Sequence, residues 1–187
     1  MENEKSVSVI GLDVTDSIKL VEIRESDASD IFVTIDTQRK YLGEWLPFVE
    51  FTQSIADTQS FIADVRSVSA AKGDYVFAIR YENNFAGLIG FKDTDKGNRK
   101  TEIGYWLSEP FQKKGIVTRC VQALLKYAYE ELGHNRVQIK CAVGNMKSSR
   151  IPEKLGFTFE GVEREGELKA DGTYRDVKVY SMLKREF

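Results

Sequence analysis

The spacing of apolar residues alternates along the chain between the two-residue period of strands and the period near 3.6 of helices. Strand-like spacing occurs at residues 17–23, 75–81, 85–92, 101–107, 136–143, 157–168 and 174–183. Helical spacing occurs at residues 28–35, 54–71, 117–132 and 145–154, and residues 41–51 suit a short helix followed by a loop. The pattern therefore predicts the element order β-α-α-β-β-β-α-β-α-β-β.

Turn residues support this division. Asn83-Asn84 and Asp171-Gly172 each predict a tight hairpin between two strands, and Gly133 predicts the end of the clearest helix. Hairpins beside a strand-helix-strand passage imply a mixed sheet with helices on both faces, which is an α/β fold. A chain of 187 residues suits one domain, spanning 1–187, with about the first six residues loosely held.

Composition excludes several classes of protein. The net charge of −2 and the pI of about 5.6 argue against general binding of nucleic acid, which usually requires a basic surface. The chain has no apolar run near the ~20 residues of a membrane span and no signal peptide at its start, so we expect a cytoplasmic protein. With Cys120, Cys141 and the single His134, we expect buried thiols, no disulfide, no Cys-His nucleophile and no metal site.

The segment with the most informative chemistry joins a predicted strand to the clearest helix. Its sequence over residues 104–118 is G-Y-W-L-S-E-P-F-Q-K-K-G-I-V-T, so Gly115 opens the helix after Gln112, Lys113 and Lys114. Backbone N–H groups at a helix N-terminus are unsatisfied, and a glycine there lets a bulky pyrophosphate approach them. The residues predict an anion site, but they also fit a plain strand-to-helix connection whose glycine serves only a turn.

The same run resembles the coenzyme A signature of the GNAT superfamily, Gln/Arg-x-x-Gly-x-Gly/Ala, which lies between the fourth strand and third helix of that fold. Gln112, Gly115 and Val117 occupy the three marked positions, and Val117 is larger than the usual Gly or Ala. The resemblance implies that acetyl-coenzyme A is bound as the acetyl donor. The residues it assigns to this cofactor are Trp106, Leu107, Gln112, Lys113, Lys114, Gly115, Ile116, Val117, Thr118 and Asn145.

A second segment carries the resemblance further. Residues 145–157, N-M-K-S-S-R-I-P-E-K-L-G-F, are similar to the Asn-x-x-Ser-x-x-hydrophobic-x-x-Lys/Arg-x-Gly-Phe segment of the superfamily, and the likeness extends over 18–183. Residues 46–48, 102–107 and 159–161 resemble, more narrowly, the ribosomal-protein N-terminal acetyltransferases of the RimJ/RimL type. The two segments in this order make the resemblance specific.

This resemblance implies a fold and a reaction. The fold is the single-domain acetyltransferase (GNAT) fold, an α/β domain with a mixed, mostly antiparallel sheet that splays where the cofactor binds. The reaction is transfer of an acetyl group from acetyl-coenzyme A to a primary amine, most specifically the N-terminal α-amine of a protein such as a ribosomal protein. The alternatives are a small-molecule amine as acceptor and a non-catalytic acyl-coenzyme A-binding module. Such enzymes often pair, which makes a homo-oligomer compatible with the family.

A general base is needed because an α-amine with a pKa of about 8 is mostly protonated at neutral pH. Glu167 matches the acidic position to which RimL-like enzymes assign this base, and its alternative is an ordinary exposed strand carboxylate. Glu163 and Glu165 would lie on the same face of the strand as Glu167 if no bulge intervened at Gly166.

Ser148 matches the position that donates a proton toward the coenzyme sulfur in this subfamily, and its alternative is an ordinary helix N-cap. Asn145 either contacts the pantetheine arm or caps the helix. Pro152 would remove the helical hydrogen bond to Ser148 if the helix began at Asn145, so we expect either a later start near Ser149 or a kink.

Two more sites follow from the resemblance or from composition. The backbone N–H near Leu107 is the expected oxyanion donor. Trp45 and Phe48, in an aromatic segment with Phe51, are candidates for the acceptor-binding side, and their alternative is an ordinary apolar core.

Overall fold

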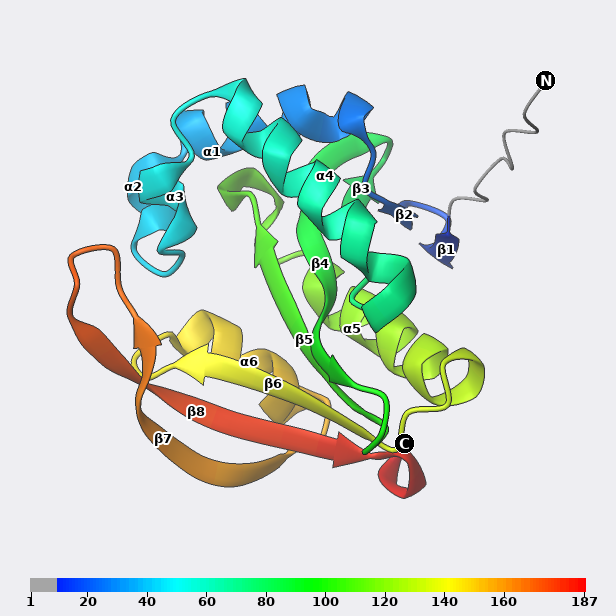
Figure 1. Cartoon of the computed structure of the whole chain (residues 1–187). Helices are drawn as coiled ribbons and strands as arrows, with labels where there is room; N and C mark the ends of the chain where they lie inside the picture. Colours follow the sequence, from blue (N-terminus) through cyan, green and yellow to red (C-terminus); the bar gives the residue numbers. More distant parts are fainter. Residues whose placement is uncertain (1–9) are drawn as a thin grey trace.

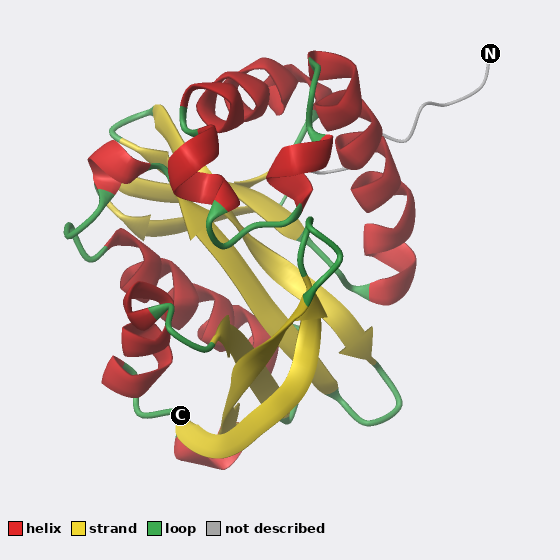
Figure 2. Ribbon diagram, turned by 90° about the vertical axis from the view of Figure 1, so that its left-hand side faces the viewer, coloured by secondary structure: helices red, strands yellow, loops and turns green. Residues whose placement is uncertain are grey.

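The computed structural model describes residues 10–187, in which eight strands form one sheet with helices on both faces (Figures 1 and 2). The strands are β1 (Gly11–Thr15), β2 (Ile18–Glu22), β3 (Val76–Tyr81), β4 (Asn84–Asp95), β5 (Lys100–Leu107), β6 (Arg136–Ala142), β7 (Thr158–Leu168) and β8 (Tyr174–Leu183). The α-helices are α1 (Ala28–Thr37), α2 (Arg39–Gly43), α3 (Phe48–Phe51), α4 (Ile55–Lys72), α5 (Ile116–Lys126) and α6 (Met146–Lys154). Short turns of other helix types are η1 (Glu25–Asp27), η2 (Glu109–Phe111), the π-helical η3 (Tyr127–Glu131) and η4 (Lys184–Glu186).

The sheet has the order β1-β2-β3-β4-β5-β6-β8-β7, and every neighbouring pair is antiparallel except β5 and β6. That parallel pair is short, because its register covers only Lys100–Glu102 of β5 against Arg136–Gln138 of β6. Beyond these residues the two strands run in different directions, as Figure 1 shows. The mixed, mostly antiparallel sheet splayed at one point confirms the predicted fold class.

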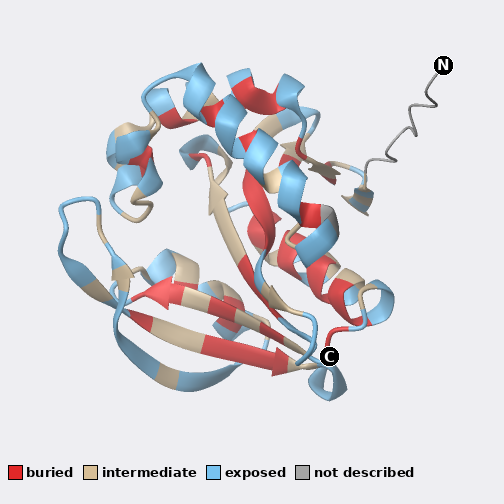
Figure 3. Cartoon of the chain, in the orientation of Figure 1, coloured by how far each residue is buried: buried red, intermediate tan, exposed pale blue. Residues whose placement is uncertain are grey.

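Two apolar clusters hold the helices against the sheet. The larger one packs α5 and α6 on one face, with Ile103, Val121, Leu124, Ile139 and Tyr180 among its buried members. The smaller one packs α1 to α4 on the central strands, with Ile31, Ile35, Ile62, Ala78 and Leu88. In Figure 3 the buried positions concentrate on the central strands and on the inner side of α5, whereas β7 is mostly exposed.

Most predicted elements are confirmed, with four differences. Strand β1 was not predicted, and the expected short helix in 41–51 is two helices, α2 and α3. The first hairpin turns at Glu82-Asn83, one position earlier than predicted, and both residues have the positive φ of a type I′ turn. The clearest helix ends as an α-helix at Lys126 and continues as a π-helical turn.

Two expectations from the sequence concern the whole chain. The expected looseness of the first six residues lies outside the described residues, and the extent of the domain over 1–187 stays a prediction. Among the helices within residues 10–187, none combines the length and apolarity that crossing a membrane requires.

Candidate active site

The start of α5 has the geometry of an anion site. Gly115 occupies the N-cap position with a φ of 71°, no side chain among residues 10–187 caps the helix, and the first backbone bond onto this turn is from Arg119 N to Gly115 O at 3.2 Å. The preceding N–H groups have no partner within the helix. A Cβ added at Gly115 would meet no atom within 4 Å, so the space before the helix is open. The residues present therefore fit a bound pyrophosphate.

The first two side chains of α5 are buried in the core. Ile116 and Val117 are buried in the larger apolar cluster, so their contribution to an anion site would come from backbone N–H groups. Thr118 is half-buried and Lys113 is exposed, with a φ of 62°. Lys114 is exposed too, and its ammonium lies 4.7 Å from the centre of a tyrosine ring on β3.

A tyrosine ties the loop before α5 to the end of β5. Gln112 donates a hydrogen bond to the hydroxyl of Tyr41, which in turn donates to the carbonyl of Leu107 at 3.3 Å. Burial raises the pKa of Tyr41 above its ordinary value, which keeps the hydroxyl protonated. Gln112 is thus engaged in positioning the loop around the predicted site.

The backbone of Leu107 faces the splayed region. Ser108 N bonds to Ala86 O at 2.8 Å, and alternate residues of an antiparallel strand direct their backbone groups to opposite sides. The N–H of Leu107 is therefore turned away from β4, toward the side from which β6 has diverged. The Trp106 side chain lies on the face of the sheet that α1 to α4 cover, where it packs edge-on to Phe85 in the smaller apolar cluster.

Asn145, rather than Ser148, is the N-cap of α6. Its side-chain oxygen accepts a 3.1 Å hydrogen bond from the backbone N of Ser148, and the helix begins at Met146. Of the two alternatives for Asn145, the structure shows the helix cap, and a contact to the pantetheine arm stays a prediction. The alternative in which Ser148 is itself the cap is wrong, and so is a helix start near Ser149, because Asn145 satisfies the first turn.

Ser148 is held by groups from two strands. Tyr105 donates a 3.0 Å hydrogen bond to its carbonyl, and the Ser148 hydroxyl lies 3.3 Å from the Tyr105 oxygen and 3.2 Å from the sulfur of Cys141. Pro152, four residues on, lies inside the helix and has no N–H for this carbonyl. Burial raises the pKa of Tyr105 well above its ordinary value and also raises that of Cys141, so both groups stay protonated near neutral pH.

Glu167 is fixed near the segment that joins α2 and α3. Its Oε2 accepts a 2.5 Å hydrogen bond from Nε of Arg175, and the same guanidinium donates to the carbonyls of Glu44 at 3.2 Å and Trp45 at 2.5 Å. The hairpin of β7 and β8 reaches toward α2 and α3 in Figure 1. Glu167 and Trp45 are therefore brought together, whereas Phe48 lies 40% exposed on α3.

The condition for a common face of Glu163, Glu165 and Glu167 is not met, although Glu163 and Glu167 stay on one face because they pair with Val177 and Arg175, which are two residues apart on β8. The register of β7 shifts between Glu163 and Glu167, and Glu165 takes a φ of 52°. A bulge interrupts the alternation of side chains, which was the condition attached to that expectation. Glu163 instead pairs with Lys140 at 2.7 Å.

The sequence did not single out three residues that organise this site. Tyr41, Tyr105 and Arg175 make their bonds to positions far away in the chain, so no local motif marks them. The only available signal was the residue type, because tyrosine and arginine carry donors that need partners when buried.

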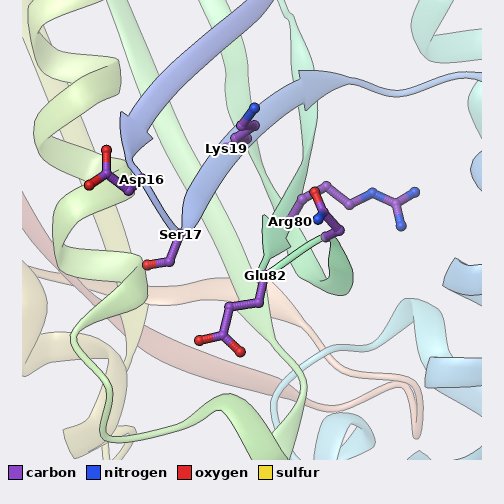
Figure 4. Close-up of a pocket in the computed structure, with 6 residues that line it drawn as sticks. Asp16, Ser17, Lys19, Arg80 and Glu82 are labelled. Atoms are coloured by element: carbon purple, nitrogen blue, oxygen red, sulfur yellow. The ribbon is translucent and has the colours of Figure 1, made fainter.

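A surface pocket of about 330 Å³ lies elsewhere, at the turns between β1 and β2 and between β3 and β4 (Figure 4). It is lined by Asp16, Ser17, Lys19, Arg80, Glu82 and Asn83. None of the predicted site residues contributes to it. In the part of the chain that the structure describes, no group of three or more His, Cys, Asp or Glu side chains is arranged to hold a metal ion.

Known proteins share both the sequence and the fold. The family described as an acetyltransferase (GNAT) domain matches residues 17–158. YdaF of Bacillus subtilis (strain 168), provisionally named a ribosomal N-acetyltransferase, is 40% identical over 173 residues, which are 91% of this chain and 92% of that protein. The microcin C7 self-immunity acetyltransferase MccE, solved with acetyl-CoA and AMP, is 31% identical with a TM-score of 0.88, over 92% of this chain and 96% of its own. RimL, the ribosomal L7/L12 alpha-N-protein acetyltransferase, solved with coenzyme A, is 26% identical with a TM-score of 0.87, over 94% of this chain and 98% of its own.

Proposed function

The chain belongs to the GNAT family of acetyl-coenzyme A-dependent N-acetyltransferases, and on this premise we propose that its acceptor is the N-terminal α-amine of a protein, with a ribosomal protein as the favoured substrate. Two relatives support the acceptor class, since YdaF is provisionally named a ribosomal N-acetyltransferase and RimL is named for the α-amine of ribosomal L7/L12. The observation in this chain that carries the proposal is that Glu102, Glu163 and Glu167 are each paired with a cation, as described below.

The donor site would be made by this chain's backbone. Acetyl-coenzyme A supplies the acetyl group as a thioester when it is bound. The N–H groups that follow Gly115 would hold its pyrophosphate at the positive end of the α5 dipole, with Lys113 adding charge. An extended arm would bind where β5 and β6 no longer pair with each other, and Leu107 and Ser148 lie on opposite sides of that divergence.

Three groups of this chain would carry the chemistry. Glu167 takes the proton from the acceptor ammonium, directly or through a water, so that the free amine can form its bond to the carbonyl carbon. The N–H of Leu107 stabilises the negative charge that develops on the carbonyl oxygen. The Ser148 hydroxyl would donate a proton to the sulfur as the carbon–sulfur bond breaks, and it would regain one from the nitrogen, which loses its second proton as the amide forms.

Charge pairing around Glu167 favours a peptide over a polycation. Three carboxylates of β5 and β7 are each paired with a cation: Glu102 with Lys92 at 2.8 Å, Glu163 with Lys140 at 2.7 Å and Glu167 with Arg175 at 2.5 Å. A polyamine with two or more charges would need several free carboxylates to replace its hydration. A protein N-terminus carries one charge at the reacting end, which Glu167 alone can match.

A small-molecule amine is the second candidate. The observation in its favour is the similarity to MccE, a self-immunity acetyltransferase solved with AMP. That acceptor class predicts turnover with a small amine and none with peptides.

A thiol-release assay with acetyl-coenzyme A separates these possibilities. The panel contains peptides with a free α-amine, the same peptides with a blocked N-terminus, spermidine and an aminoacyl nucleotide analogue. We expect release with the free peptides and not with the blocked ones. Release with the nucleotide analogue alone would support the second candidate. Tight cofactor binding without release for any amine would mean a non-catalytic module and would refute the proposal.

A further inference from the structure

We propose that Tyr105 is a positioning residue, which holds Ser148 in its working place through the backbone carbonyl that Pro152 leaves without a helical partner. The inference deepens the proposed function, since it rests on the role assigned to Ser148 there. None of the sequence motifs assigns a role to Tyr105.

The carbonyl of Ser148 needs a donor from outside the helix. In a regular helix it would accept the N–H of residue 152, but Pro152 has none. The neighbouring bonds are intact, from Ser149 N to Asn145 O at 3.0 Å and from Leu155 N to Ile151 O at 3.1 Å. Pro152 thus removes one hydrogen bond from the helix, and the Tyr105 hydroxyl replaces it with a bond of 3.0 Å to the Ser148 carbonyl.

This bond crosses the divergence between the two strands. The ladder of β5 and β6 ends at Glu102 and Gln138, and Tyr105 lies three residues further, roughly 10 Å along an extended strand. Ser148 belongs to the helix that follows β6. The hydrogen bond therefore links the two diverging arms at the level of the proposed reaction and sets where α6 stands relative to β5.

Ser148 is consequently fixed at three atoms. Its N donates to Asn145, its carbonyl accepts from Tyr105, and its hydroxyl lies between the Tyr105 oxygen and the Cys141 sulfur. Burial keeps Tyr105 protonated, so it remains a donor over the pH range in which the enzyme would work. Without the Tyr105 hydroxyl, the first turn of α6 loses its anchor to β5 while Asn145 still caps it.

The test is a set of variants measured for turnover, for the Kd of coenzyme A and for thermal stability. Tyr105→Phe keeps the ring and removes the donor, and we expect at least a ~10-fold fall in kcat with coenzyme A affinity within about threefold of wild type. The loss should not add to that of Ser148→Ala. In the Tyr105→Phe background, Pro152→Ala returns an N–H to the same carbonyl, so it should recover part of the turnover.

A stability cycle tests the carbonyl bond without any acceptor. Pro152→Ala should raise the Tm by about 2–4 °C more in the Tyr105→Phe protein than in wild type, because only there does the carbonyl lack a donor. Tyr129→Phe is the matched control, since its hydroxyl donates at 2.7 Å to a backbone carbonyl of β8, that of Met182, from the turn η3 that follows α5. That variant should lose stability and keep its turnover.

Each outcome decides the matter. Turnover of Tyr105→Phe within threefold of wild type, additive changes in Tm, or no recovery with Pro152→Ala would overturn the positioning role. These results leave the proposed function standing if Ser148→Ala is impaired. Normal turnover of Ser148→Ala would instead refute the assignment of Ser148 as the proton donor. Tyr105 would then have no catalytic group to position.

Discussion

Arg175 and Glu167 form a hydrogen-bonded ion pair of 2.5 Å across the β7–β8 hairpin, and the same guanidinium binds the carbonyls of Glu44 and Trp45. One planar group with several donors therefore fixes both the proposed base and the segment between α2 and α3. Only Oε2 of Glu167 accepts a hydrogen bond from the described residues, which leaves Oε1 able to meet an acceptor amine. The pair orients the carboxylate and joins two distant parts of the chain at the site.

Glu167→Gln tests the proposed base. Glutamine keeps the size and one oxygen but takes no proton, so kcat near neutral pH should fall by ~100- to 10,000-fold. Steady-state kinetics on the identified acceptor measure this. Raising the pH should recover part of the loss, because solvent then supplies more free amine.

The matched control is Glu163→Gln on the same strand, where the carboxylate pairs with Lys140 beyond the bulge. It should keep turnover close to wild type. A Glu167→Gln protein within about threefold of wild type at pH 7 would exclude Glu167 as the base.

Gly115→Glu tests the anion site at α5. The substitution places a negative side chain in the open space before the helix, so the Kd of acetyl-coenzyme A should rise at least ~10-fold, or about 1.4 kcal/mol. Calorimetry measures the affinity. Gly133→Glu is the matched control, because Gly133 has a similar φ of 69° and equally open space beyond the other end of the helix. Equal affinities for the two variants would contradict the site.

Ser148→Ala should separate catalysis from capping. Asn145 caps α6, so removing the Ser148 hydroxyl should lower turnover while Tm and coenzyme A affinity stay near wild type. Asn145→Ala should cost about 1 kcal/mol of stability, the usual value for a lost N-cap. A Ser148→Ala protein that loses stability and retains its turnover would show that the hydroxyl has only a structural role.

Glu160 gives a pH-dependent contribution to stability. Hydrogen bonds from Arg136, together with one from Ser181, lower its pKa from 4.5 to about 2. Because the folded-state pKa is depressed, the stabilisation is present above about pH 4.5 and is lost as pH falls toward 2. Glu160→Gln should therefore unfold at a lower Tm than wild type at pH 7, and the gap should narrow over that window. A gap independent of pH would rule out this ion pair as its cause.

Local patterns in the sequence predicted most of the fold. The spacing of apolar residues located the long strands and α5. An asparagine at position 145, just before a helical run, indicated a possible N-cap. Strand β1 was missed because its five residues, G-L-D-V-T, contain only two with strong apolar character and lie at the sheet edge. The type I′ turn lies one residue before the predicted Asn83-Asn84, because Glu82 adopts a positive φ that its residue type does not suggest.

The site was predicted less completely because its contacts join distant segments. Pro152 indicated that the Ser148 carbonyl would lack a partner, but the donor, Tyr105, is 43 positions away. Arg175 likewise reaches Trp45 across 130 positions. Gly166 hinted at the bulge in β7, yet only the register shows that the step from Glu163 to Glu167 spans just two residues of β8. Such pairings depend on tertiary packing, which no single stretch of sequence encodes.

The most direct test of the account locates the acetyl group on one peptide that offers two amines. A peptide with a free N-terminus and an internal lysine is incubated with the enzyme and acetyl-coenzyme A, and fragmentation mass spectrometry assigns the modified nitrogen. The proposed function predicts acetylation of the α-amine, abolished when the N-terminus is blocked and strongly reduced with Glu167→Gln. Acetylation of the lysine side chain instead, or of spermidine but neither peptide amine, would contradict it.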